Sequence, residues 1–151
     1  MFTKPNTINL TFLCIIFICI MMLSSCGVSD WIYELPNGYS IWEINCNDIA
    51  LIKEVDKSSR TALSRYILEF CYNNSYIGIK RISIDENIPY PEVQIDKLDK
   101  SHPDYYLVDT TADFILGPYT AEEYYIQIET LEIGDMCDWI KTVPKPNGAI
   151  T

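Results

Sequence analysis

The chain contains a single histidine, His102, in a segment with the residue types of a serine-nucleophile triad. Ser101, His102 and Asp104 could supply a nucleophile, a base and an acid. A triad needs side chains that the fold brings together, whereas these three residues are almost adjacent in a loop that contains Pro103, where neighbouring side chains diverge. We therefore interpret this segment as a surface loop.

Acidic side chains are the next candidates for chemistry, because the 151 residues include 21 Asp and Glu. Asp96, Asp99 and Asp104 could offer oxygen ligands to calcium, but their spacing departs from the EF-hand pattern and no glycine supplies its sharp turn. Two carboxylates could also hydrolyse glycosides, although no spacing singles out a pair. Motifs of nucleotide-binding, zinc-peptidase and serine-hydrolase sites are absent from the sequence. We expect no metal, no cofactor and no enzyme activity, with an unrecognised carboxylate site as the alternative.

The excess of acidic residues indicates which class of partner the chain can bind. The 21 acidic and 11 basic side chains give a net charge of −10, which argues against nucleic-acid binding. Residues 85–103, with three prolines and seven charges, predict a long loop, a kind of loop that is often functional. Its charges could simply be solvated, or they could form a face for a basic partner. The members of this partner patch would be Tyr90, Glu92, Asp96, Asp99, Asp104, Tyr105 and Tyr106.

The most specific chemical feature is a thiol at the end of an apolar segment. Residues 8–23 are almost continuously apolar, but 16 residues are fewer than the roughly 20 that span a bilayer. Such a segment is typical of a secretory signal. The sequence Leu23-Ser24-Ser25-Cys26 follows it and resembles the lipobox of bacterial lipoproteins. The resemblance implies that the Cys26 thiol takes up a diacylglyceryl group and that the Ser25–Cys26 bond is cleaved. An uncleaved anchor or an ordinary signal peptide is the alternative.

These features predict how the chain is organised. Residues 1–25 would be a removed signal peptide, 26–30 a lipidated tether, 31–143 a single small domain and 144–151 a loose tail. Removal of Lys4 leaves 126 residues with 10 basic and 21 acidic side chains, so the mature net charge becomes −11. The protein would then lie in the cell envelope, outside the cytoplasm, anchored to an inner or outer membrane by lipid.

Three cysteines of the mature chain are left once Cys26 is acylated. An exported protein can form disulfides, but an odd count leaves at least one thiol free or in an intermolecular bond. The sequence ranks none of the pairs among Cys46, Cys71 and Cys137. Cys71 lies between two aromatic residues in a strand-like segment, so we interpret it as a buried, inert thiol.

Alternating apolar and polar residues predict strands that follow one another as hairpins. Pro36-Asn37-Gly38 predicts a tight turn, and a slip of phase at Lys80-Arg81 suggests a β-bulge. Thr120 and Glu123 form a capping box that predicts a helix ending near Gly134. The predicted strands are 31–35, 39–45, 49–54, 65–72, 76–84, 105–109 and 113–116, with a polar connection over 56–64 and an edge element over 135–143.

This order of elements favours an α+β fold: an antiparallel β-meander of hairpins with one C-terminal helix packed on the sheet. A small half-open β-barrel with a helix is the alternative.

Four motifs then carry a resemblance to a known family. They are Leu35-Pro36-Asn37-Gly38-Tyr39, residues 72–80, Tyr106-Leu107-Val108-Asp109-Thr110 and residues 117–124. Together, over residues 31–133, they resemble a family of small bacterial lipoproteins known only as a domain of unknown function. The resemblance implies export and one small domain, and it carries over no catalytic residue. We therefore expect a lipid-anchored binding or structural module that meets the membrane through Cys26 and a protein or polymer of the envelope. An inhibitor or immunity-type lipoprotein that blocks its partner with the 85–103 loop is the alternative.

Overall fold

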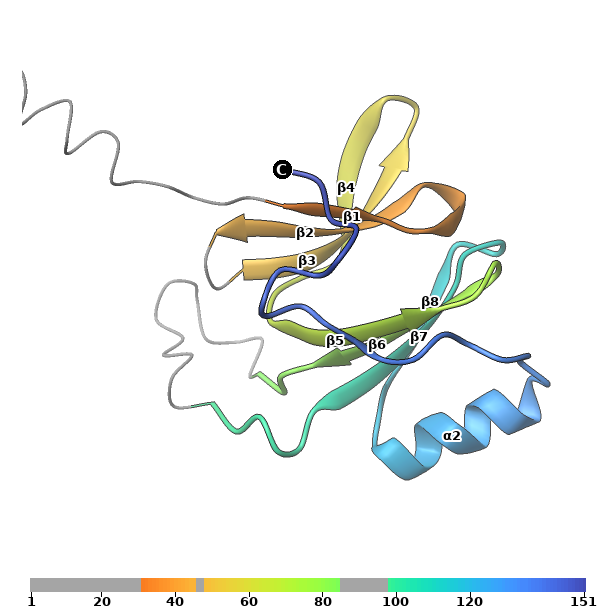
Figure 1. Ribbon diagram of the computed structural model, residues 1–151. Helices are drawn as coiled ribbons and strands as arrows, with labels where there is room; N and C mark the ends of the chain where they lie inside the picture. The colour runs from red at the N-terminus through yellow and green to blue at the C-terminus, as the bar shows by residue number, and fades with distance from the viewer. Residues whose placement is uncertain (1–30, 46–47, 85–97) are drawn as a thin grey trace, which may run out of the picture.

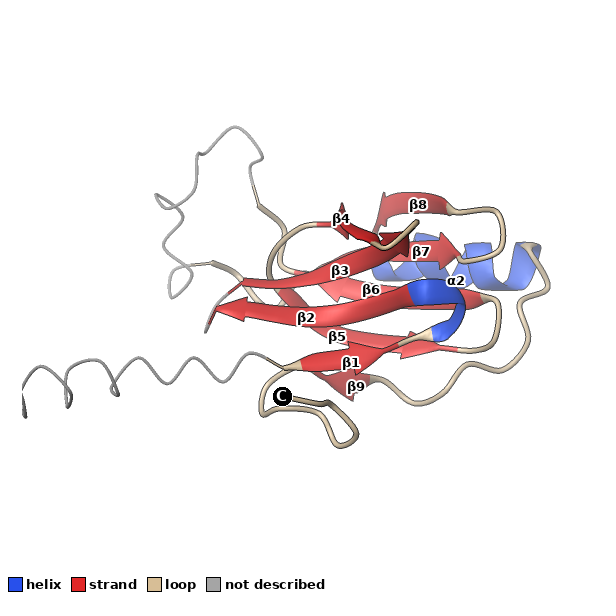
Figure 2. Ribbon diagram, turned by 90° about the horizontal axis from the view of Figure 1, so that it is seen from above, coloured by secondary structure: helices blue, strands red, loops and turns tan. Residues whose placement is uncertain are grey.

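The fold consists of two antiparallel sheets that lie face to face (Figures 1 and 2). Figure 1 shows a computed structural model, which describes residues 31–45, 48–84 and 98–151. The described strands do not close into a barrel, and one helix lies on the outer side of the second sheet (Figure 1). The predicted class of antiparallel hairpins with a C-terminal helix on a sheet is confirmed, and the meander is divided between two sheets.

Most paired strands are neighbours in sequence, and the pair of β5 with β9 is the exception. The first has the order β1-β2-β3-β4 and the second the order β8-β7-β6-β5-β9. None of the helices in the described ranges is long and apolar enough to cross a bilayer. The elements are β1 (Ile32–Glu34), the 3-10 turn η1 (Pro36–Gly38), β2 (Tyr39–Asn45), β3 (Asp48–Val55), β4 (Ser58–Leu63), β5 (Ile67–Tyr72), β6 (Tyr76–Arg81), β7 (Asp104–Asp109), β8 (Phe114–Tyr119), α2 (Ala121–Thr130) and β9 (Ile140–Lys141).

The hydrophobic core lies between the sheets, because alternate residues of each strand point inward. Tyr39 and Ile41 of β2 face Phe70 of β5, with Ile77 and Ile79 of β6 in the same cluster. These side chains are almost fully buried. The core therefore joins the two sheets into one packed unit.

The segment over residues 56–64 corrects the prediction of a polar connection. Residues 58–63 form β4, which pairs with β3. The hairpin between the two strands turns at Asp56 and Lys57. Both turn residues have positive φ, 50° and 66°, which is the conformation of a tight hairpin turn. The hairpin could not be predicted from the sequence, because Asp56-Lys57 lacks the glycine that usually marks such a turn.

The predicted β-bulge lies on the neighbouring strand. The register between β5 and β6 shifts between Ile67 and Glu69, which pair with Arg81 and Lys80. Leu68 is therefore the additional residue, opposite the place where the phase of β6 slips.

The helix α2 begins as predicted and ends earlier. Thr120 and Glu123 form a complete capping box. The helix ends at Thr130 rather than near Gly134, and Glu132 follows with a φ of 51°. The buried residue of the helix, Tyr124, packs on the second sheet over Gly78. A Cβ added to Gly78 would lie 2.7 Å from the sulfur of Cys71. Gly78 thus permits the helix to approach the sheet.

The last eight residues are not a loose tail. Ile150 pairs with Ile32 through two backbone hydrogen bonds of 2.8 Å, and Pro146 is buried. The expected tail over 144–151 is therefore packed against β1. The pairing supplies β1 with a partner on its open side, which its three residues alone would leave exposed.

The sandwich has two ends that differ in what they carry. At the end that we call the Trp31 end, the described chain begins beside the end of β2, where the Glu43 amide donates to the Trp31 carbonyl at 2.9 Å. The opposite end, which we call the turn end, carries η1, residues 73–75 and residues 110–113 (Figure 2).

Candidate functional site

A cavity of about 430 Å³ opens where β7 begins and α2 starts. We call it the acidic cavity, because carboxylates and aromatic rings line it. Its walls come from two segments that are distant in sequence but adjacent in the fold, since Tyr105 of β7 pairs with Tyr119 of β8. The lining residues are Ser101, His102, Pro103, Asp104, Tyr105, Pro118, Tyr119, Thr120, Ala121 and Glu123.

The capping box fixes one carboxylate of the acidic cavity. The Glu123 carboxylate accepts hydrogen bonds from the Thr120 amide at 2.8 Å and from the Thr120 hydroxyl at 2.9 Å. These bonds hold the pKa of Glu123 below its ordinary value, because they favour the ionised form. Glu123 therefore carries a negative charge at neutral pH at the rim of the cavity.

The floor of the acidic cavity continues into a cluster of aromatic rings. The ring of Tyr105 lies 5.4 Å from that of Tyr124 and 6.1 Å from that of Trp139, measured between centroids. The ammonium group of Lys80 lies 4.1 Å from the centre of the Trp139 ring and bonds Glu69 at 2.6 Å. Packing and cation–π contacts thus hold Tyr105 in a fixed position.

The only histidine does come close to a serine and an aspartate, but not as a triad. Its Nδ1 lies 2.9 Å from the Ser101 hydroxyl oxygen and 2.8 Å from the Asp99 carboxylate. A triad histidine uses one ring nitrogen for the nucleophile and the other for the acid, so two partners on Nδ1 form no relay. The side chains of His102 and Asp99 are 86% and 64% exposed. Hydrogen bonds from Ser101 and His102 lower the pKa of Asp99.

The partner patch expected from the sequence is only partly visible. Tyr90, Glu92 and Asp96 lie outside the described residues. Asp104 and Tyr105 line the acidic cavity, whereas Asp99 contacts it through His102.

Tyr106 points the other way. It is buried beneath the first sheet, and its hydroxyl accepts a hydrogen bond from Arg81 at 2.8 Å. Adjacent residues of a strand face opposite sides of the sheet, so Tyr105 and Tyr106 could not belong to one surface.

Sequence reasoning missed three residues of the acidic cavity. The sequence predicts His102 as a loop residue, Glu123 as a helix cap and Tyr119 as part of a family motif, but none of the three as part of a cavity with Tyr105. The capping box could have indicated that a carboxylate lies at the start of the helix. Nothing in the sequence indicates that β7 begins beside that helix start.

A second polar cluster joins the two sheets at the turn end. The side-chain amide of Asn37 donates to the Thr110 hydroxyl at 2.8 Å and to the Asn74 carbonyl at 3.2 Å. The Tyr39 hydroxyl donates to the Asp113 carboxylate, which also bonds Arg60 at 2.6 Å. We call these residues the cross-sheet clasp. Its hydrogen bonds are used within the protein, so it is a structural element rather than an open site.

The ionisation of the clasp follows from these contacts. The hydrogen bond from Tyr39 and the charge of Arg60 lower the pKa of Asp113. Burial and the bond to Asp113 raise the pKa of Tyr39. The carboxylate is therefore charged and the phenol neutral over a wide pH range.

The sequence model of one protein family matches residues 36–141, from the start of η1 to the end of β9. The chain belongs to the family of proteins of unknown function DUF3997. The resemblance to a family known only as a domain of unknown function is thereby confirmed. No curated protein and no solved structure gives a significant match.

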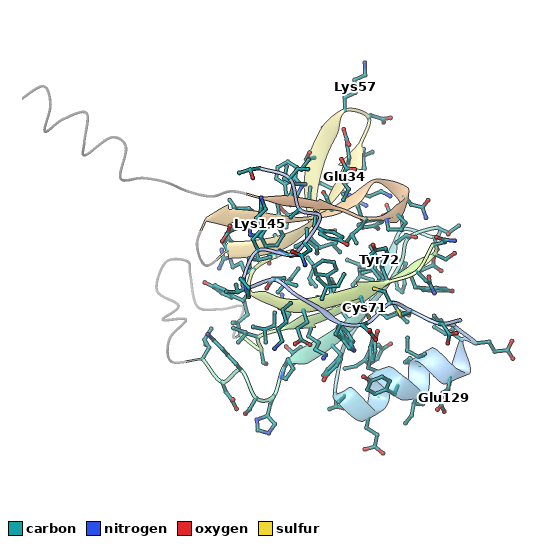
Figure 3. The ribbon with its side chains drawn as sticks, viewed as in Figure 1. Glu34, Lys57, Cys71, Tyr72, Glu129 and Lys145 are labelled. Carbon is teal, nitrogen blue, oxygen red and sulfur yellow. The ribbon has the colours of Figure 1, made fainter. Side chains whose placement is uncertain are left out.

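The DUF3997 region contains both the acidic cavity and the cross-sheet clasp. It also contains residues 120–139, where six Asp and Glu occur without any Lys or Arg. Glu129 of this segment projects from α2 (Figure 3). Within the described ranges, no three His, Cys, Asp or Glu side chains lie close enough to hold a metal ion. Six of the 21 acidic residues of this chain therefore lie in the segment that contains α2.

Proposed function

We propose that this DUF3997 protein is a lipid-anchored extracytoplasmic module that binds a basic segment of an envelope partner in the acidic cavity. The observation that carries the proposal is the lining of that cavity, where Asp104 and Glu123 lie beside the rings of Tyr105 and Tyr119. Carboxylates attract Lys and Arg side chains, and aromatic rings bind the same cations through their faces. The combination suits a basic partner better than a neutral or acidic one.

The surroundings of the acidic cavity support the same partner chemistry. Residues 120–139 contribute six negative charges and no positive one, so the field near the helix attracts cations. Tyr125 and Ile126 lie exposed on α2 and add apolar area beside the charges. A partner segment that combines Lys or Arg with apolar residues would match both features.

The membrane part of the proposal rests on Cys26 and its lipobox. Diacylglycerol on the thiol would provide stable attachment, since anchoring increases with each buried methylene group. Metabolic labelling with palmitate tests it in the full-length protein. We expect label in the wild type and neither label nor membrane retention in Cys26→Ala. Membrane retention of unlabelled Cys26→Ala, equal to that of the wild type, would refute the anchor.

Binding is tested by zero-length coupling of carboxylates to amines on membranes that carry the full-length protein. The variant Asp104→Asn with Glu123→Gln removes two charges from the acidic cavity, and Gln at position 123 can still cap the helix. We expect the coupled product to fall at least about fivefold, which corresponds to roughly 1 kcal/mol for a lost charged contact.

The matched control removes two exposed charges from the β3–β4 hairpin, Glu54→Gln with Asp56→Asn, and should couple as the wild type does. Raised salt should weaken the wild-type product, because exposed charges are screened. Equal coupling by both double variants would refute the binding proposal.

A further inference from the structure

A second cavity, of about 390 Å³, opens at the Trp31 end of the sandwich. Its apolar wall is formed by Ile49, Ile67 and Ile82, which are almost fully buried. Two lysines, Lys100 and Lys141, lie at its rim and are exposed. We call it the basic-rimmed cavity. An apolar wall with two cations at the rim suits a ligand that has an anionic head and an apolar tail.

Among the described residues that line this cavity, Glu69 is the acid, and its charge is compensated. Glu69 bonds the ammonium group of Lys80 at 2.6 Å, and both side chains are largely buried. Lys100 and Lys141 are therefore the uncompensated charges of the described lining. Val143, also in the lining, is 67% exposed and gives the rim an apolar edge.

Other exposed apolar side chains lie around Trp31, where the described residues begin. Trp31 is held beside Glu43, and the next residue of β2, Ile44, is exposed. Ile150, which pairs with Ile32, is exposed as well. Figure 3 shows Lys145 on this side of the sandwich and Glu129 on the far side, on α2. Apolar residues with lysines among them are typical of a surface that meets lipid headgroups.

The length of chain before Trp31 determines which end can reach a membrane. Cys26 precedes Trp31 by five residues. Five residues span at most about 18 Å when fully extended, because each adds no more than about 3.6 Å. A seven-residue strand such as β2 already measures about 23 Å. A lipid on Cys26 therefore keeps the Trp31 end near the bilayer and leaves the turn end directed away.

We propose that the Trp31 end rests on the membrane and that the basic-rimmed cavity binds a phospholipid, with the phosphate between Lys100 and Lys141 and the upper acyl carbons against the isoleucine wall. This inference rests on the lipid anchor proposed above. The chain as a whole is acidic, but the rim of this cavity carries two lysines, so its local charge suits an anionic headgroup.

Photocrosslinking in cells tests the inference with the full-length protein. A photoreactive benzoylphenylalanine replaces Val143 at the rim, and the matched control replaces Phe114, which is 58% exposed at the turn end. Both positions are exposed, so neither replacement disturbs the core. We expect phospholipid adducts, identified by mass, at position 143 and none at position 114.

The lysines are tested in the position-143 background. Lys100→Glu with Lys141→Glu should reduce the phospholipid adduct by about 25-fold, since each of the two basic residues near an anionic surface contributes about fivefold to binding. Lys57→Glu, at the tip of the β3–β4 hairpin (Figure 3), is the control and should leave it unchanged.

Two results would overturn the inference: protein adducts in place of phospholipid at position 143, or equal phospholipid adducts at positions 143 and 114. Palmitate labelling of the same samples separates the two proposals. If Cys26 carries label and position 143 gives no phospholipid adduct, the anchor stands and the basic-rimmed cavity does not bind lipid. If Cys26 carries no label, both proposals fail.

Discussion

Two cavities of similar size lie on either side of residues 98–103, and their linings are opposite in chemistry. The acidic cavity measures about 430 Å³ and contains Asp104 and Glu123, whereas the basic-rimmed cavity measures about 390 Å³ and carries Lys100 and Lys141. From their volumes alone, we would expect the two cavities to bind ligands of similar size. Their charges instead differ in sign, and for this reason we propose a basic partner for one cavity and anionic lipid for the other.

The two cavities also differ in the elements that form their walls. The acidic cavity has the start of α2 as one wall, and α2 is fixed to the sheet by a single buried side chain, Tyr124. The basic-rimmed cavity is formed by strand ends and needs no helix. Changes at the helix should therefore affect one cavity and spare the other.

The largest effect is expected for Tyr124→Ala, which removes a side chain that is 1% exposed. Loss of such an aromatic residue costs about 3–5 kcal/mol. Urea unfolding of the full-length protein in detergent should show this loss, and coupling at the acidic cavity should disappear. The control Tyr125→Ala, at an exposed position on the same helix, should change stability by no more than about 0.5 kcal/mol. Loss of phospholipid adducts at position 143 in a folded Tyr124→Ala protein would contradict the separation of the cavities.

A smaller loss of about 1–3 kcal/mol is expected for Gly78→Ala, because overpacking forces its neighbours to move. The new Cβ would collide with the Tyr124 hydroxyl and with the sulfur of Cys71. Gly134→Ala adds the same methyl group where no atom lies within 4 Å and should cost little. Equal stability of the two variants in the same urea series would show that α2 does not pack closely on β6.

The cross-sheet clasp lines neither cavity but joins the two sheets. The pKa of Asp113 lies below its ordinary 3.8, so its bonds contribute stability above about pH 4 and lose it as the pH falls further. The pKa of Tyr39 lies above its ordinary 10.0, so its contribution is complete below pH 10 and is lost as the pH rises beyond. Tyr39→Phe should cost about 1 kcal/mol at neutral pH and weaken both dependences. An unchanged pH profile of unfolding in Tyr39→Phe would show that the clasp contributes nothing.

The smallest expected change is chemical rather than energetic. Burial raises the pKa of the Cys71 thiol to about 11, while Cys137 is exposed. Iodoacetamide at pH 8 should modify Cys137 and leave Cys71 intact, as mass mapping would show. Tyr124→Ala should make Cys71 reactive, since the Tyr124 hydroxyl lies 3.9 Å from its sulfur. Equal modification of Cys71 and Cys137 in the wild type would contradict the packing of α2.

The sequence predicted features that depend on neighbouring residues. The turn at residues 36–38, the hairpin turn at 73–75 and the capping box at Thr120 all follow from local hydrogen-bonding preferences. Cys71 is buried as expected, because its neighbours in a strand are aromatic. Asp104 and Tyr105 are predicted members of the partner patch because of their charge and aromatic ring, and both residues line the acidic cavity.

Features that depend on distant contacts were not predictable in this way. The chain crosses between the sheets at Arg65 and Tyr66, which have φ values of 62° and 59° and no glycine to indicate a reversal. The tail residue Ile150 pairs with Ile32 across almost the whole chain. The basic-rimmed cavity combines residues from β3, β5 and β9, so no single segment indicates it.

The most direct test places the same photoreactive residue in each cavity of the full-length protein. Tyr119 lines the acidic cavity and Val143 lines the basic-rimmed one. We expect crosslinks to a protein with a basic segment at position 119 and to phospholipid at position 143. The same product at both positions would show that the two cavities do not select ligands of opposite charge.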